Sequence, residues 1–108
     1  MTRRDDQRIA DILEACEELA DLATMRNQGE IPRWVLNRAA ERLLELVGEA
    51  STALSEGTRA GYPEVPWRDI TRLRVLLAHH YHRVDPDQVW VVVDGEIPRL
   101  VTALRARR

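Results

Sequence analysis

Three residues in the second half of the chain could together cleave a phosphodiester without a metal ion. They are Arg74, His79 and Tyr81, arranged as Arg-x4-His-x-Tyr within an otherwise apolar helical segment. Histidine titrates near neutral pH and can move a proton. Arginine keeps its charge and matches phosphate geometry with its fork of donors, and a tyrosine hydroxyl can hydrogen-bond a phosphate or be modified itself. These residue types therefore indicate phosphodiester chemistry.

The spacing alone is a weak signal, because the chain contains 16 arginines and no lysine. Among the three histidines, His80 also follows Arg74 at a suitable distance, and His79 follows Arg72. Short motifs of this kind produce chance matches. The neighbouring sequence must therefore decide whether the motif is meaningful.

The sequence on either side of the motif is more specific. The block Tyr-Pro-Glu-Val-Pro-Trp-Arg-Asp-Ile at 62–70 precedes it, and His-Arg-Val-Asp at 82–85 with Val-Trp at 89–90 follows it. Ala-Asp-Ile-Leu-Glu-Ala-Cys at 10–16 and Val-Gly-Glu-Ala at 47–50 complete the pattern. Taken together, the sequence resembles the HepT-like proteins of the HEPN superfamily over nearly its whole length.

The resemblance implies a metal-independent endoribonuclease, the toxin of a HEPN/nucleotidyltransferase toxin–antitoxin module. His79 would take the proton from a ribose 2′-hydroxyl, so that this oxygen attacks the adjacent phosphate, and Arg74 would stabilise the charge of the transition state. A minimal nucleotidyltransferase antitoxin would attach adenylyl groups to Tyr81, and the added phosphates would block the cleft. Neither metal nor cofactor is expected. Supporting contacts to RNA would come from Arg72, His80 and Arg83.

Two positions depart from the family pattern. Val75 stands where family members usually carry Asn or Asp, and Ala78 stands where Ile or Val is usual. Val75 and the acidic net charge favour an alternative interpretation, a non-catalytic HEPN subunit that binds the partner or substrate of a nucleotidyltransferase. A third interpretation is a helical interaction protein without nucleotide chemistry.

The composition predicts one soluble domain spanning 1–108. The net charge of −2 gives no overall basic field, so RNA binding would need a local patch. Cys16 is the single cysteine and cannot form an internal disulfide, which fits a reducing cytoplasm. The sequence has no leader-like segment and no apolar run of membrane-spanning length, so we expect a cytoplasmic protein without membrane contact.

Apolar spacing predicts an all-α fold, an antiparallel bundle of four main helices. The first helix should run from Asp5 to Arg26, with Gly29 suited to a left-handed cap. The second should start at Pro32, end near Gly57 or Gly61, and bury one stripe: Val35, Ala39, Leu43, Leu46, Val47, Ala50 and Leu54. A glycine within this helix, Gly48, could permit a close helix approach.

The third helix should begin near Pro66, with Ile70, Leu73, Leu76 and Leu77 as its apolar side, and the chain should turn near Arg83. Asp85 should cap the last helix, with Gln88 closing a capping box. Pro98 should kink this helix, because proline lacks an amide proton and clashes with the preceding turn. The run Val91–Val93 could also form a strand, but the sequence offers it no partner strand.

Helix geometry separates the motif residues. Arg74 and Tyr81 are seven residues apart and would share a face to within about 20°, whereas His79 would lie roughly 140° from Arg74. The three groups meet only if the helix end unwinds, if the long Arg74 side chain folds over, or if a second copy contributes. The resemblance implies the last option, a cleft at a two-fold interface, and therefore a homodimer.

Ordinary structural roles are the alternatives at each position. Arg74 could pair with Asp69 or Glu96, leaving His79 as a polar residue at a helix end. Zinc binding at His79 and His82 is disfavoured, since no cysteine or carboxylate ligand lies at a suitable spacing. The three tryptophans are predicted to be core or interface anchors rather than base-stacking residues: Trp34, Trp67 and Trp90.

Overall fold

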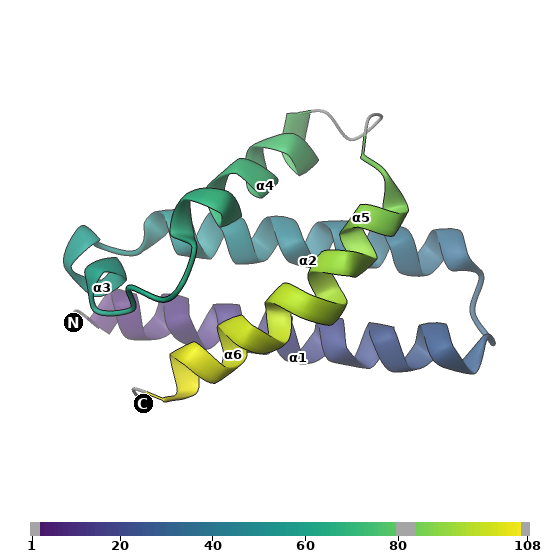
Figure 1. The fold of residues 1–108 in the computed structure, drawn as a ribbon, viewed down its shortest axis with the longest axis horizontal. Helices are drawn as coiled ribbons and strands as arrows, with labels where there is room; N and C mark the ends of the chain where they lie inside the picture. The colour runs from purple at the N-terminus through teal and green to yellow at the C-terminus, as the bar shows by residue number, and fades with distance from the viewer. Residues whose placement is uncertain (1–2, 80–83, 107–108) are drawn as a thin grey trace.

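Two long antiparallel helices form the scaffold on which the other helices pack. In the computed structural model, which describes residues 3–79 and 84–106, α1 spans Arg3–Gln28 and α2 spans Arg33–Ala53. They lie side by side along most of their length (Figure 1). Gly29 ends α1 with a φ of 75°, and its amide donates to the carbonyl of Met25 at 3.2 Å. The left-handed cap predicted at this glycine is confirmed.

The remaining helices pack on this pair. Helix α4 (Trp67–His79) lies on α2, and the C-terminal run comprises α5 (Pro86–Val91), the π-helical η2 (Val92–Glu96) and α6 (Ile97–Arg105). Figure 1 shows this run crossing the pair obliquely, with α5 over α2 and with η2 and α6 against α1. The described residues form helices and no strand, which confirms the predicted all-α bundle and the helical interpretation of Val91–Val93.

The core lies between α1, α2 and the C-terminal run. Its fully buried members include Ile9, Ile12, Leu19, Leu44 and Leu104. Burial of apolar side chains from three segments far apart in sequence is what holds these elements together. None of the helices in the described part of the chain is both long and apolar enough to cross a membrane.

The buried face of α2 differs from the predicted stripe. Val35 and Leu46 were expected inside, yet they are 37% and 36% exposed, and the residues buried instead are Leu36, Ala40 and Leu44. Helix α2 carries apolar residues on two adjacent stripes, and periodicity alone does not say which one faces the core. Three of the predicted positions are buried: Val47, Ala50 and Leu54.

Helix α2 also ends earlier than predicted, at Ala53 rather than near Gly57 or Gly61. Ser55 starts a new short helix, α3 (Glu56–Ala60), by accepting a hydrogen bond from the amide of Thr58. The carboxylate of Asp5 holds this turn: it accepts from the Ser55 amide at 3.1 Å, the Ser55 hydroxyl at 2.8 Å and the Thr58 hydroxyl at 2.7 Å. A residue 50 positions upstream thus fixes the break, so local spacing could not predict it.

The C-terminal run begins as predicted, with Asp85 accepting a hydrogen bond from the Asp87 amide at 2.9 Å. The predicted capping box is not formed, because Gln88 contributes its backbone amide to the Asp85 carbonyl and leaves its side chain exposed. Directly before Pro98, where a kink was predicted, the structure has the π-helical turn η2. There the amide of Ile97 bonds to the carbonyl of Val92, which widens the helix just before the proline ring.

The three tryptophans have different surroundings. Trp90 is buried and donates to Asn37 Oδ1 at 2.7 Å, with the Arg26 guanidinium 4.6 Å from its ring centroid. Trp67 is half-buried and donates to the carbonyl of Arg59 at 3.0 Å. Trp34 is 69% exposed. Trp34 is therefore not a core residue, and the alternative role predicted for it, at an interface, stays a prediction. Trp67 and Trp90 do anchor their helices.

Candidate active site

Arg74 lies directly against Gly48, where α4 packs on α2. A methyl group added to Gly48 would overlap Arg74 Cβ and would lie 3.0 Å from its Cγ and 3.3 Å from its Cα. Only a residue without a side chain allows this approach. The close helix contact predicted at Gly48 is confirmed, and it fixes the stem of the candidate catalytic arginine.

The guanidinium of Arg74 lacks the partners that a structural arginine would have. Its Nε is buried and has no hydrogen-bond partner, and none of the ion pairs among the described residues involves Arg74. Both alternative partners, Asp69 and Glu96, are exposed at the surface. Buried polar atoms are nearly always bonded, so an unpartnered one calls for an explanation. Arg74 therefore has no carboxylate partner among the described residues.

His79 is the last residue of α4 and is exposed. The helix is unbroken from Arg74 to His79, so the two side chains leave it about 140° apart. Unwinding of the helix before His79, one of the three ways to assemble the site, is therefore not observed. Within one described chain the structure does not bring Arg74 and His79 onto one face.

The outward face of α4 carries His79 together with Arg72, which is also exposed. The two are seven residues apart and therefore about 20° apart around the helix. Val75 and Leu76 are 42% and 40% exposed on the same side of α4. The prediction that Leu76 faces the core is wrong, while Leu77 is buried and Ile70 and Leu73 pack partly against the core. This face is thus both basic and apolar.

Several predicted site residues lie outside the part of the chain that the structure describes. They are His80, Tyr81, His82 and Arg83, together with the turn predicted near Arg83. The roles of these residues in RNA binding and modification remain predictions from the sequence, as does the argument against zinc binding at His82. Within residues 3–79 and 84–106, no group of three His, Cys, Asp or Glu side chains is placed to hold a metal ion.

An apolar groove that the sequence did not predict separates α4 from the C-terminal run. It has a volume of about 620 Å³, and its lining includes Val47, Ile70, Leu73, Val92 and Leu100. Charged side chains contribute to its wall: Glu64, Asp69, Glu96 and Arg99. Its sides come from segments far apart in sequence, which is why no local pattern could have revealed it. The groove adjoins the helix that carries Arg74 and His79.

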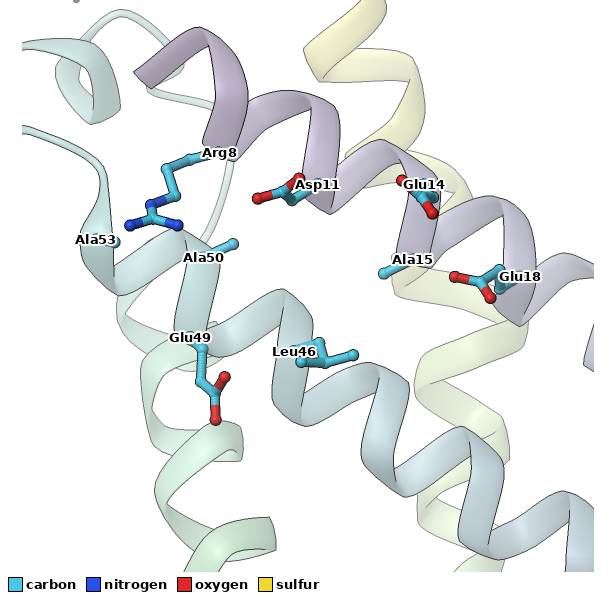
Figure 2. Close-up of a pocket in the computed structure, with 9 residues that line it drawn as sticks. All are labelled: Arg8, Asp11, Glu14, Ala15, Glu18, Leu46, Glu49, Ala50 and Ala53. Atoms are coloured by element: carbon cyan, nitrogen blue, oxygen red, sulfur yellow. The ribbon is translucent and has the colours of Figure 1, made fainter. Parts of the chain in front are cut away.

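A second groove, between α1 and α2, has the wrong charge for RNA. Figure 2 shows Asp11, Glu14 and Glu18 along α1 and Glu49 on α2. These side chains line a hollow with a volume of about 470 Å³. Arg8 is the basic side chain in this lining, and the apolar part is formed by Leu46 and three alanines. Carboxylates at this density repel phosphate groups. The groove is therefore unsuited to a nucleic-acid backbone.

Cys16 can be set aside as a nucleophile. It is 1% exposed in the core, and burial raises the pKa of its thiol to about 12. A thiol needs its deprotonated form to attack a substrate. Cys16 is therefore not a candidate for the nucleophile of this site.

Comparison with known proteins identifies the class to which this fold and helix motif belong. The family model described as "Ribonuclease HepT-like" matches residues 12–106. The chain belongs to the HepT-like ribonuclease family, which confirms the resemblance drawn from the motif and its flanking sequence.

Related proteins carry consistent names. "Putative RNase MJ1380" of Methanocaldococcus jannaschii is 30% identical over 102 residues, 93% of this chain and 94% of that protein. "Putative RNase TTE0752" of Caldanaerobacter subterraneus is 34% identical over 90 residues, 82% of this chain and 80% of its own length. "Probable ribonuclease HepT" of Thermococcus cleftensis is 40% identical over 62 residues, covering 57% of this chain and 56% of that protein. No solved structure matches the chain significantly.

Proposed function

We propose that this protein is a metal-independent endoribonuclease that acts as a homodimer. The observation that carries the proposal is the unpartnered, partly buried guanidinium of Arg74, fixed against Gly48 in a chain of the HepT-like ribonuclease family. A guanidinium held without an acidic partner is ready to bind a phosphate. A purely structural arginine would be expected to pair with a carboxylate.

In the proposed reaction, His79 removes the proton from a ribose 2′-hydroxyl. The 2′-oxygen then attacks the adjacent phosphorus, and Arg74 stabilises the negative charge that develops on the non-bridging oxygens. The bond from phosphorus to the 5′-oxygen of the next nucleotide breaks, and that oxygen takes up a proton. The products are a 2′,3′-cyclic phosphate and a free 5′-hydroxyl. DNA, which lacks the 2′-hydroxyl, should remain intact.

A second copy of the chain could bring an arginine and a histidine to the same phosphodiester. Arg74 and His79 diverge on one helix, so a site that uses both is more easily built from two copies of α4 related by a two-fold axis. Exposed apolar residues on α4 and α5 support such an interface: Val75, Leu76 and, at 62% exposure, Val91. Exposed apolar patches of this kind typically mark protein contacts. Pairing would also bring two Arg74 and two Arg72 side chains together, which offsets the acidic net charge locally.

The proposal extends to a toxin whose antitoxin is a minimal nucleotidyltransferase. Tyr81 follows Arg74 by seven residues, and adenylyl groups on its hydroxyl would add negative charge where substrate phosphate must bind. The attached phosphates would compete with substrate RNA for Arg74. Because they belong to the same molecule, their effective concentration would be high. This would neutralise the ribonuclease without destroying its fold.

Expression of the protein alone, and together with a nucleotidyltransferase encoded beside it, tests this function. Degraded cellular RNA and arrested growth are expected from the protein alone, and intact RNA is expected from the pair. Intact-mass analysis of the pair should show added AMP groups that are absent from Tyr81→Phe. An unmodified Tyr81 in a fully neutralised pair would mean inhibition by simple binding. RNA that stays intact with the protein alone would favour the non-catalytic alternative.

A further inference from the structure

We infer that Gly48 is a positioning residue for Arg74, an inference that rests on the proposed ribonuclease function. The contact joins the backbone of α2 to the start of the Arg74 side chain. A Cβ at position 48 would meet Arg74 at Cβ, Cγ and Cα, none of which belongs to the flexible end of the side chain. The clash could not be relieved by a change of rotamer alone, so α4 would have to move away from α2.

The same contact sets the direction in which the guanidinium points. Because the stem lies on Gly48, the Nε atom is buried against the protein while the whole residue stays partly exposed. Because its Nε is shielded from water, this guanidinium should interact more strongly with an anion than a fully solvated one would. Moving α4 outward would let water reach Nε and would loosen this orientation.

The other glycines of helical segments provide the contrast. A Cβ added to Gly57 in α3 or Gly95 in η2 would meet no atom within 4 Å. Neither has a positive φ, since Gly29 is the only glycine with one in the described chain. Alanine should fit at both positions. Gly95→Ala is therefore a matched control for Gly48→Ala, with the same added methyl group in a helical segment but no contact with Arg74.

The expected effect of Gly48→Ala is a fall in kcat of roughly 10- to 100-fold, the scale of a catalytic group displaced by about 1 Å. KM should change much less, because the exposed Arg72 would still be available to bind the RNA backbone. Gly95→Ala should cleave RNA at the wild-type rate. Equal activity of Gly48→Ala and wild type would overturn the inference.

A double-mutant cycle separates positioning from a general loss of folded protein. If Gly48 acts through Arg74, adding Gly48→Ala to Arg74→Ala should not lower the residual cleavage rate further. If Gly48→Ala merely reduces the folded fraction, it should lower the rate by the same factor in both backgrounds. The second result would refute the positioning role.

Magnetic resonance of the arginine Nε–H groups tests the inference without any activity. The Nε proton of Arg74 should exchange slowly with water in the wild-type protein, whereas that of exposed Arg72 on the same helix should exchange quickly. Gly48→Ala should speed the exchange at Arg74, and Gly95→Ala should not. Fast exchange at Arg74 in the wild type would disprove the inference even if Gly48→Ala failed to fold. If the Arg74 Nε proton exchanges slowly but the protein does not cleave RNA, the proposed ribonuclease function is rejected. The contact between Gly48 and Arg74 would still be supported.

Discussion

Arg74 and His79 leave one unbroken helix about 140° apart. Arg74 points toward α2, where its stem meets Gly48, and His79 projects outward from the end of α4. A base and a transition-state stabiliser must both lie within hydrogen-bond reach of the same phosphodiester. This divergence makes a site shared between two copies the simplest arrangement, and it can be tested directly.

Mixing two inactive variants should restore activity. In a heterodimer of Arg74→Ala and His79→Ala, a site that takes its arginine from one subunit and its histidine from the other retains one complete pair. After unfolding and refolding of the mixture, cleavage should return to about a quarter of the wild-type rate, since half the dimers are mixed and each holds one intact site. No recovery from a mixture that forms heterodimers would place both residues of each site on one subunit.

Each variant alone should lose RNA cleavage while keeping its fold. Arg74→Ala and His79→Ala each remove a group that acts in the transition state, on the order of 3 kcal/mol or about 100-fold in rate. Arg72→Ala serves as a control, because it removes an arginine from the same helix and should weaken binding rather than abolish cleavage. Circular dichroism should show unchanged helicity in all three.

Chelation should leave the activity unchanged, because the proposed reaction uses no metal. Cleavage of a short RNA in excess EDTA should proceed at the untreated rate and should yield a 2′,3′-cyclic phosphate, detectable by mass spectrometry. An RNA of the same sequence with a 2′-deoxy nucleotide at the cleavage position should not be cleaved. If EDTA abolished the activity and added zinc restored it, the result would indicate that cleavage depends on a metal ion bound by the histidines.

The motif and the helices were predictable from the sequence because both depend on local spacing. Arg-x4-His-x-Tyr with its flanking block indicated the family, and the left-handed cap at Gly29 follows from residue type alone. The close approach at Gly48 was also foreseeable, although its partner was not. Identifying Arg74 as that partner requires the packing of α4 on α2, which no periodicity encodes.

The errors in the buried face and the end of α2 come from tertiary contacts. The choice between the two apolar stripes of α2 depends on where α1 and the C-terminal run pack, so Val35 and Leu46 were wrongly placed inside. The break after Ala53 depends on the distant Asp5. The groove beside α4 is assembled from α2, α4 and the C-terminal run. Each of these features joins residues that are far apart in sequence.

The buried thiol of Cys16 should make stability fall at alkaline pH. Burial raises the pKa of Cys16 from 9.0 to about 12. Below pH 9 the thiol is protonated in both folded and unfolded chains, whereas between pH 9 and 12 the unfolded chain alone releases the proton and is favoured. The free energy of unfolding should therefore drop across this window more steeply in the wild type than in Cys16→Ala. Urea titrations at pH 8 and 10.5 would detect the difference, and parallel curves would contradict it.

Asp5 should be among the most important polar residues for stability. Asp5 is 3% exposed, and its carboxylate accepts hydrogen bonds from Ser55 and Thr58, joining the start of α1 to the turn between α2 and α3. Asp5→Ala would leave the Ser55 amide and the Thr58 hydroxyl without their acceptor and should lower the free energy of unfolding by about 2–3 kcal/mol. Asp6→Ala is the matched control, since Asp6 occupies the same helix turn but is exposed, and it should cost no more than about 0.5 kcal/mol. Equal urea midpoints for the two variants would show that the network does not fix this end of the bundle.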